Sequence, residues 1–294
     1  MKILMAGSSG LIGSALVGQL RAEGHEVVCL VRRKPLSNEE FAWDVVRGEI
    51  DTAALNGVDA VVHLGGSNIA EGRWTSARKA ALRTSRIDST ALLVNALQRC
   101  DTKPDIFICA SAIGLYGNRG DEVLTEESVP GSGFLAELGQ AWEEAASGAP
   151  TQVVQARFGI VLSRAGGALD KMLLPFKLGL GGRLGNGRQY MSWIGLDDAV
   201  AALHWMLESR ALSGPVNVVS PHPVRNLEFT RALGRALKRP TPFPVPRLGL
   251  RLALGEMADE ALLASQRVEP RKLLDAAFSF STPDLDSALS VALE

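Results

Sequence analysis

A glycine-rich turn near the start of the chain constrains the fold more than any other feature of the sequence. Residues 2–6, KILMA, predict a short buried strand, and an amphipathic helix is predicted to follow residue 13. The residues between them, GSSGLIG, place glycines at every third position. Such a turn lets the backbone approach a pyrophosphate, and the free N–H groups and partial positive charge of the next helix hold that group. We therefore expect a dinucleotide to bind at the start of the chain.

A second predicted strand, EVVCLV at residues 26–31, completes a strand–helix–strand unit around this turn. The glycine spacing is G-x-x-G-x-x-G, whereas the general dinucleotide fingerprint is G-x-G-x-x-G. The sequence therefore indicates a variant of the fingerprint. The alternative is that three glycines only make a tight connection between a strand and a helix.

Basic residues follow the second strand, where an NAD-binding site usually carries an acidic residue for the ribose 2′-hydroxyl. The residues here are Arg32, Arg33 and Lys34. Because a guanidinium group matches a phosphate in shape and charge, we predict that NADP(H) is preferred to NAD(H). The alternative is a solvated basic strand end.

Composition argues against several classes of function. The formal net charge is -1, so no global field attracts nucleic acid or an anionic membrane. No apolar run approaches the length of a membrane span, and the chain enters a strand at once, so no signal peptide is expected. The three cysteines show no metal-ligand spacing, and their odd number argues against a disulfide framework. We expect a cytoplasmic protein with reduced thiols.

Strand and helix patterns alternate through the first two-thirds of the chain. Further strands are expected at residues 60–64, 105–110 and 152–158, and helices at 75–100 and 135–146. This alternation predicts an α/β fold of the Rossmann type, with a doubly wound parallel sheet.

The pattern changes after Leu162. A helix is expected at residues 169–178, a glycine-rich loop at 179–187, and helix caps at Asp197-Asp198 and Asn226. No internal repeat is visible.

These patterns suggest two regions. We predict an NADP-binding Rossmann domain over residues 1–162, able to recruit later strands, and a smaller C-terminal substrate lobe over residues 163–294. The lobe ends in a distinct tail at about residues 243–294.

Several motifs together resemble the extended short-chain dehydrogenase/reductase superfamily, and within it the atypical, epimerase-like branch. The resemblance covers nearly the whole chain, and its late motifs are the specific ones. It is carried by GSSGLIG (7–13), HLGGSNI (63–69), RW (73–74), SRI (85–87), SAIGLYG (111–117), WE (142–143), LPF (174–176), the loop at 179–187, WI (193–194) and the tail from SQRV (265–268) to FSF (278–280).

The resemblance implies which residues hold NADP(H). The turn residues would cradle the pyrophosphate, basic side chains after the second strand would bind the 2′-phosphate, and two further segments would pass beside the cofactor. These are Gly7, Ser9, Gly10, Leu11, Ile12 and Gly13, then Arg32 and Arg33, then Leu64 and Gly65, and finally Arg86. The alternative for Arg86 is a surface salt bridge.

The acid–base pair usual in this superfamily is missing. Hydride transfer to a carbonyl requires a proton, which a Tyr-x-x-x-Lys pair normally supplies. Gly120 stands four residues after Tyr116, and Ile194 stands four after Tyr190, so neither tyrosine makes the pair. Ser111, at the carboxyl end of a strand, and Tyr116 are therefore the predicted catalytic residues. Glu137 and Glu143 are further candidates, and each of these four also has a purely structural interpretation.

Two other features are candidate ligand sites. His63 ends a strand beside two glycines and could touch the cofactor or hold a hydrogen bond in the structure. The loop at 179–187, with Arg183, Arg188 and Gln189, could bind a substrate phosphate or be a solvated surface loop. The other histidines form no ligand spacing with His63, so no metal site is predicted.

Two functions stay open from the sequence. One is an NADP(H)-dependent, epimerase-like oxidoreductase acting on a small-molecule substrate with an atypical acid–base group. The other is a non-catalytic NADP(H)-binding regulatory or protein-interaction module. Neither a nucleic acid nor a membrane partner is expected, and a homo-oligomer is compatible with both.

Overall fold

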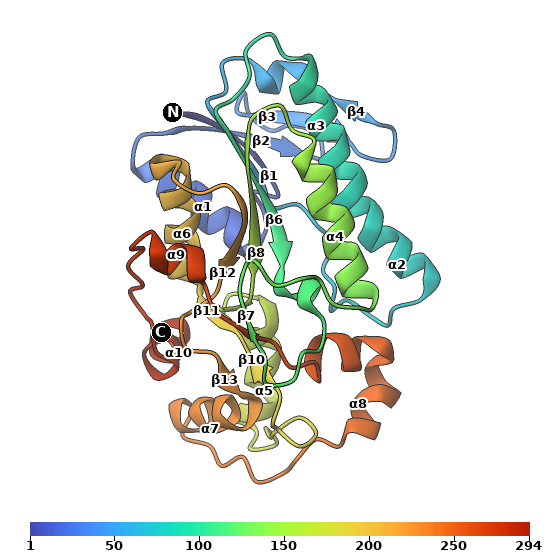
Figure 1. Ribbon diagram of the computed structural model, residues 1–294, viewed down its shortest axis with the longest axis vertical. Coiled ribbons are helices and arrows are strands. Elements are labelled where there is room, and N and C mark those ends of the chain that lie inside the picture. The colour runs from blue at the N-terminus through green and yellow to red at the C-terminus, as the bar shows by residue number, and fades with distance from the viewer.

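The main body of the protein is an eight-stranded sheet with β1 near its middle (Figure 1). The computed structural model describes residues 1–294. Neighbouring strands are parallel except β3 and β4. This architecture confirms the doubly wound sheet predicted from the sequence. The strand order is β12 (Gly214–Val218), β8 (Gln152–Phe158), β6 (Ile106–Ala112), β5 (Ala60–His63), β1 (Lys2–Ala6), β2 (Glu26–Val31), β3 (Glu40–Asp44) and β4 (Glu49–Ile50).

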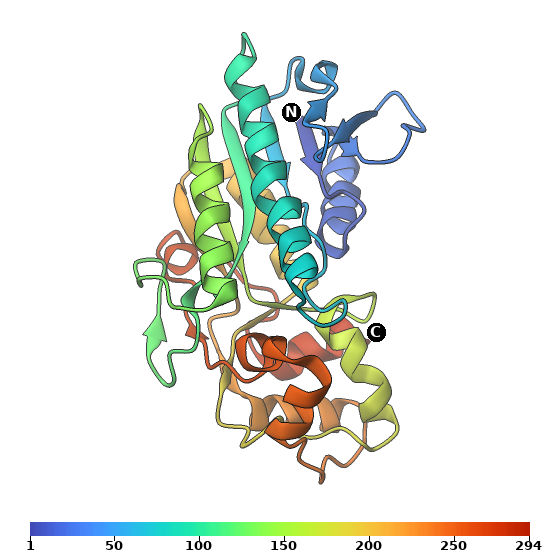
Figure 2. The same ribbon diagram turned by 90° about the vertical axis from the view of Figure 1, so that its right-hand side faces the viewer.

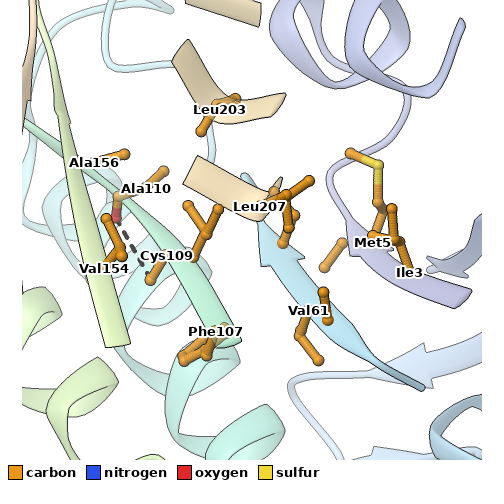
Figure 3. Packing of buried hydrophobic residues seen from close by; sticks show 14 of the residues in the cluster. Ile3, Met5, Val61, Phe107, Cys109, Ala110, Val154, Ala156, Leu203 and Leu207 are labelled. Atoms are coloured by element: carbon orange, nitrogen blue, oxygen red, sulfur yellow. Dashed lines mark hydrogen bonds between the residues drawn. The ribbon is translucent and has the colours of Figure 1, made fainter. Parts of the chain in front are cut away.

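Helices cover both faces of this sheet (Figures 1 and 2), so its central strands are continuous apolar runs. On one face Leu203 and Leu207 of α6 point toward strand residues such as Cys109 (Figure 3). No helix combines the length and the apolar content needed to cross a bilayer. The first face carries α1 (Leu11–Ala22) and α6 (Leu196–Ser209), and the other carries α2 (Ser76–Arg83), α3 (Ser89–Arg99) and α4 (Phe134–Ser147).

The helix predicted at residues 75–100 is interrupted by a π-helical turn. This turn, η2 (Thr84–Asp88), joins α2 to α3 without ending the helix. An extra residue in a helical turn shifts the side chains that follow it and often occurs at functional sites. Arg86 lies within the turn.

The smaller lobe lies beyond the carboxyl ends of the parallel strands (Figure 1). Trp193 and Phe229 belong to its own core of 12 buried residues. The later helices are α5 (Gly167–Lys177), α7 (Asn226–Ala236), α8 (Arg247–Leu254), α9 (Arg271–Asp275) and α10 (Leu285–Leu293). Short strand pairs are β9 (Ile160–Leu162) with β11 (Trp193–Gly195), β10 (Tyr190–Met191) with β13 (Val224–Arg225), and β7 (Val123–Leu124) with β14 (Arg267–Val268).

Residue 162 does not separate the two regions cleanly, because β12 and α6 come from beyond it and belong to the main body.

The expected caps also shift, since α6 follows Gly195 and α7 follows Arg225. The Asp198 carboxylate does not cap the helix. It accepts four hydrogen bonds of 2.6–3.0 Å from the backbone and hydroxyl groups of Ser281 and Thr282. The tail is thereby fixed to the start of α6.

Candidate functional site

The glycine-rich turn is packed so closely that two of its glycines leave no room for a side chain. Gly7 has a φ of +84°, and a Cβ there would lie 2.6 Å from the carbonyl carbon of Leu64. A Cβ on Gly13 would lie 2.2 Å from the carbonyl oxygen of Gly7. The N–H of Gly10 closes the turn by donating to the same oxygen at 3.1 Å. The backbone of the turn after β1 is therefore in direct contact with the start of α1 and with the segment after β5.

The start of α1 leaves backbone donors free. Its N-cap is Gly10, which has no side chain to accept a hydrogen bond. The N–H groups of Leu11, Ile12 and Gly13 therefore lack intrahelical partners, as in any first helical turn. Ser9 and Gly10 are exposed, so an anion can reach these donors from solvent. The geometry of this end of the sheet fits a pyrophosphate.

The segment after β5 is held by a buried histidine. The N–H of Gly65 donates to Nδ1 of His63 at 3.4 Å, and Nε2 of His63 lies 3.0 Å from the hydroxyl oxygen of Ser89. Burial lowers the pKa of His63 to about 4, so its ring is neutral at pH 7 and can accept this bond. His63 thus fixes Leu64 and Gly65 beside the turn.

The basic residues after β2 differ in their surroundings. The Arg33 guanidinium makes two bonds, of 2.5 and 2.8 Å, to the carboxylate of Glu40 in β3. Hydrogen bonding to Arg33 holds the pKa of Glu40 below its usual value. Arg32 is exposed and makes no hydrogen bond or ion pair. Arg32 is therefore the guanidinium available to an external phosphate.

Arg86 is a largely buried cation without an anionic partner. Its guanidinium carbon lies 5.1 Å from the centre of the Trp142 ring, and its only hydrogen bonds are 3.4 Å contacts to Leu82 and Ser85. Burial, followed by the charge of Arg78, lowers the pKa of Arg86 to about 10. A Cβ on Gly66 would lie 3.1 Å from this guanidinium, so Arg86 flanks the segment after β5. The surface salt bridge considered for Arg86 does not occur.

Ser111 lies in a buried polar network. Its hydroxyl donates to Glu143 of α4 at 2.6 Å. Both oxygens of Glu143 also accept bonds from Arg157 of β8, each at 2.7 Å. Burial alone would lower the pKa of Arg157, but the hydrogen bonds to Glu143, the charge of that carboxylate and the contact with Tyr116 together outweigh it, and the net shift is upward. This pair is a fully satisfied buried ion pair.

Tyr116 belongs to the same network. Its hydroxyl accepts a bond from Arg157 at 2.8 Å and donates to Asn217 of β12 at 2.7 Å. The side chain is 0% exposed, and burial raises the pKa of its hydroxyl. The structure therefore brings Ser111, Glu143 and Tyr116 together around Arg157. Their catalytic roles stay predictions.

Small or apolar residues stand at the carboxyl end of β6 and at the start of α4. Ala112, next to buried Ser111 on β6, is exposed, and Leu135 is partly exposed in the first turn of α4. The N–H groups of Phe134 and Leu135 donate to the carboxylate of Glu260 at 2.9 and 2.8 Å. Glu260 comes from the tail and takes the capping position of α4. Glu137 is exposed and pairs with Arg83 at 3.2 Å.

The glycine-rich loop at residues 179–187 is built into the smaller lobe. Leu184 forms a bridge with Val245, and the buried Gln189 donates to the carbonyl groups of Leu184 and Leu262. Arg183 and Arg188 are exposed. Their role toward a substrate stays a prediction.

Comparisons with known proteins agree over almost the whole chain. A family model described as "NAD dependent epimerase/dehydratase family" matches residues 3–219, and one described as "Domain of unknown function (DUF1731)" matches residues 245–292. The epimerase family protein Mb2239 of Mycobacterium bovis is 50% identical over 293 residues, which cover 99% of this chain and 97% of that protein.

Two solved structures are also similar. The crystal structure of human epimerase family protein SDR39U1 (isoform 2) with NADPH matches with a TM-score of 0.92 and 34% identity, over 100% of both chains. That of a nucleoside-diphosphate sugar epimerase from Corynebacterium glutamicum matches with a TM-score of 0.81 and 34% identity, over 100% of this chain and 58% of that one. These matches confirm the resemblance seen in the sequence motifs.

Proposed function

The chain belongs to the NAD-dependent epimerase/dehydratase family, and from this premise we propose that it is an NADP(H)-dependent oxidoreductase with an atypical active site. Ser9 to Gly13 would bind the pyrophosphate, Arg32 the 2′-phosphate, and Leu64, Gly65 and Arg86 would flank the rest of the cofactor. Arg33 would support this site through its pair with Glu40. When bound, NADPH would supply a hydride.

One observation carries the choice of cofactor: Arg32 is an exposed guanidinium without a partner directly after β2. The Glu40 carboxylate already compensates the charge of Arg33, whereas no carboxylate competes with a phosphate for Arg32. The human relative whose structure resembles this chain was crystallised with NADPH, which supports the same cofactor here.

On the substrate side, we propose that Ser111 and Tyr116 act by positioning rather than as direct proton donors. Both hydroxyls are buried and bonded within the network around Arg157. Ala112 and Leu135 carry no titratable group, and the carboxylate beside Leu135, that of Glu260, is already bonded to the first turn of α4. A small-molecule substrate would bind between the main body and the smaller lobe, and its proton would come from solvent or from the substrate itself.

The lack of a Tyr-x-x-x-Lys pair favours a second function as well. The chain would then be a non-catalytic NADP(H)-binding module whose conformation responds to the cofactor. Glu260 would carry such a response, because it ties the tail to the first turn of α4. A ligand that favours one arrangement of these parts would shift their population.

NADPH oxidation by the purified protein separates the two functions. The absorbance of NADPH is followed with a panel of aldehydes, ketones and quinones, and thermal unfolding is measured with and without NADPH. Turnover of any class of acceptor supports the oxidoreductase. A raised melting temperature with no turnover on the whole panel supports the binding module. No effect of NADPH in either assay contradicts both functions.

A further inference from the structure

Two histidines far apart in the sequence meet on the outer surface of the main body. His25 follows the end of α1, and His204 lies in α6. Their ring centres are 6.1 Å apart, and the carboxylate of Glu23 lies between α1 and α6 beside them. One ligand atom from each of Glu23, His25 and His204 lies within 4.8 Å of the other two. Spacing along the chain could not predict this cluster.

The orientation of His204 is the informative detail. Its Nε2 atom is shielded from solvent and has no hydrogen-bond partner, although Oε2 of Glu23 is only 2.7 Å away. The distance is short, but the two atoms do not form a hydrogen bond. Two ligands of one metal ion stand side by side in this way, roughly 3 Å apart, with the lone pair of the nitrogen directed at the ion.

We propose that Glu23, His25 and His204 form a binding site for one Zn²⁺ ion. Two imidazoles and a carboxylate are a donor set that Zn²⁺ favours, whereas Mg²⁺ and Ca²⁺ prefer oxygen ligands alone. Oε1 of Glu208 lies 3.5 Å from Nε2 of His204, so this second carboxylate could occupy the fourth coordination position of the ion.

A neighbouring amide can support this geometry. The side-chain amide of Gln19 lies 3.4 Å from Nδ1 of His204 and also donates to Glu23. The bond from Gln19 holds the Glu23 carboxylate beside His204, where both can bind the same ion. The ion would join the end of α1 to α6. Because α1 begins at the glycine-rich turn, the metal would stabilise the helix that carries the phosphate-binding end, independently of NADPH.

Zinc binding to the untagged protein tests this site. Isothermal titration near neutral pH is expected to give one Zn²⁺ per chain, a raised melting temperature that a chelator reverses, and no binding of Mg²⁺. Co²⁺ in place of Zn²⁺ should give a visible absorption band from nitrogen and oxygen ligands. The variants His204→Gln and Glu23→Gln should each weaken Zn²⁺ binding at least about tenfold. His222→Gln, which changes an exposed histidine elsewhere, should bind as the wild type does.

The site is contradicted if no saturable binding of one Zn²⁺ per chain occurs. It is also contradicted if His204→Gln and the wild type bind Zn²⁺ equally. Circular dichroism checks that each variant is folded, and His25→Gln takes the place of His204→Gln if that variant is not. The same two outcomes then decide.

Discussion

The guanidinium of Arg157 makes a two-point ion pair with the carboxylate of Glu143, and both nitrogen–oxygen distances are 2.7 Å. The pair joins β8 to α4, and both side chains are largely buried. Ser111 and Tyr116 bond to opposite sides of it. The two residues predicted to be catalytic are therefore organised by one buried charge pair.

Removing one partner of this pair should be strongly destabilising. Arg157→Ala leaves the Glu143 carboxylate buried and unpaired, so we expect the free energy of unfolding to fall by about 3–5 kcal/mol. Urea denaturation measures this. Arg235→Ala breaks the exposed pair with Asp286 and should cost less than about 1 kcal/mol. Equal losses in the two variants would contradict the role of the buried pair.

Two glycines of α1 should respond in opposite directions to alanine. In Gly13→Ala the new Cβ meets the Gly7 carbonyl oxygen, so we expect about 1–3 kcal/mol of destabilisation and weaker NADPH binding. Gly18 is exposed in the same helix and has open space around it, so Gly18→Ala should gain about 0.5–1 kcal/mol. Thermal unfolding and NADPH titration check both. A Gly13→Ala variant that binds NADPH normally would show that the turn is not the phosphate site.

The Arg86 side chain should lower the free energy of unfolding of the free protein and strengthen the binding of NADPH. Its charge is buried without an anion, so Arg86→Met is expected to raise the free energy of unfolding of the free protein by about 1 kcal/mol. The same variant should bind NADPH about tenfold or more weakly, because a cation near the cofactor is lost. Arg83→Met, one helical turn earlier and exposed, is the control and should keep its affinity. Unchanged NADPH binding by Arg86→Met would remove Arg86 from the site.

His63 should make stability depend on pH. Its pKa is about 4 in the folded protein and about 6.5 when unfolded, so the unfolded chain binds more protons between these values. The contribution of His63 is complete above about pH 6.5 and is lost as the pH falls toward 4, by roughly 3 kcal/mol in total. Urea denaturation at several pH values gives the slope. His63→Gln should reduce that slope by one proton, and exposed His222→Gln should not; equal slopes in all three proteins would exclude the effect.

Much of the fold followed from the sequence because its central strands are short apolar runs. The turn at Gly7 to Gly13 fixed the first strand–helix–strand unit, and β8 has the predicted bounds, 152–158. β3 was not predicted, because Glu40–Asp44 mixes polar and apolar residues next to the edge of the sheet. The π-helical turn was also missed, since a shift of one residue barely changes the helical pattern.

Only part of the candidate site could be predicted from the sequence. The glycines and Arg32 could be found because the first unit is local in the chain. The position of Arg157 was informative, because a charged residue inside a buried strand indicates that it has a buried partner. That partner, Glu143, and the capping contact of Glu260 with α4 depend on how distant segments pack. No spacing rule gives such contacts.

Isothermal titration of Arg32→Asp with NADPH and NADH tests most directly whether Arg32 recognises the 2′-phosphate of NADP(H). We predict that the variant binds NADPH about tenfold or more weakly than the wild type does, because it loses a charge-assisted bond and gains a repulsion, while NADH binding changes little. Equal losses for the two coenzymes, or no heat with either coenzyme for the wild-type protein, would contradict the account.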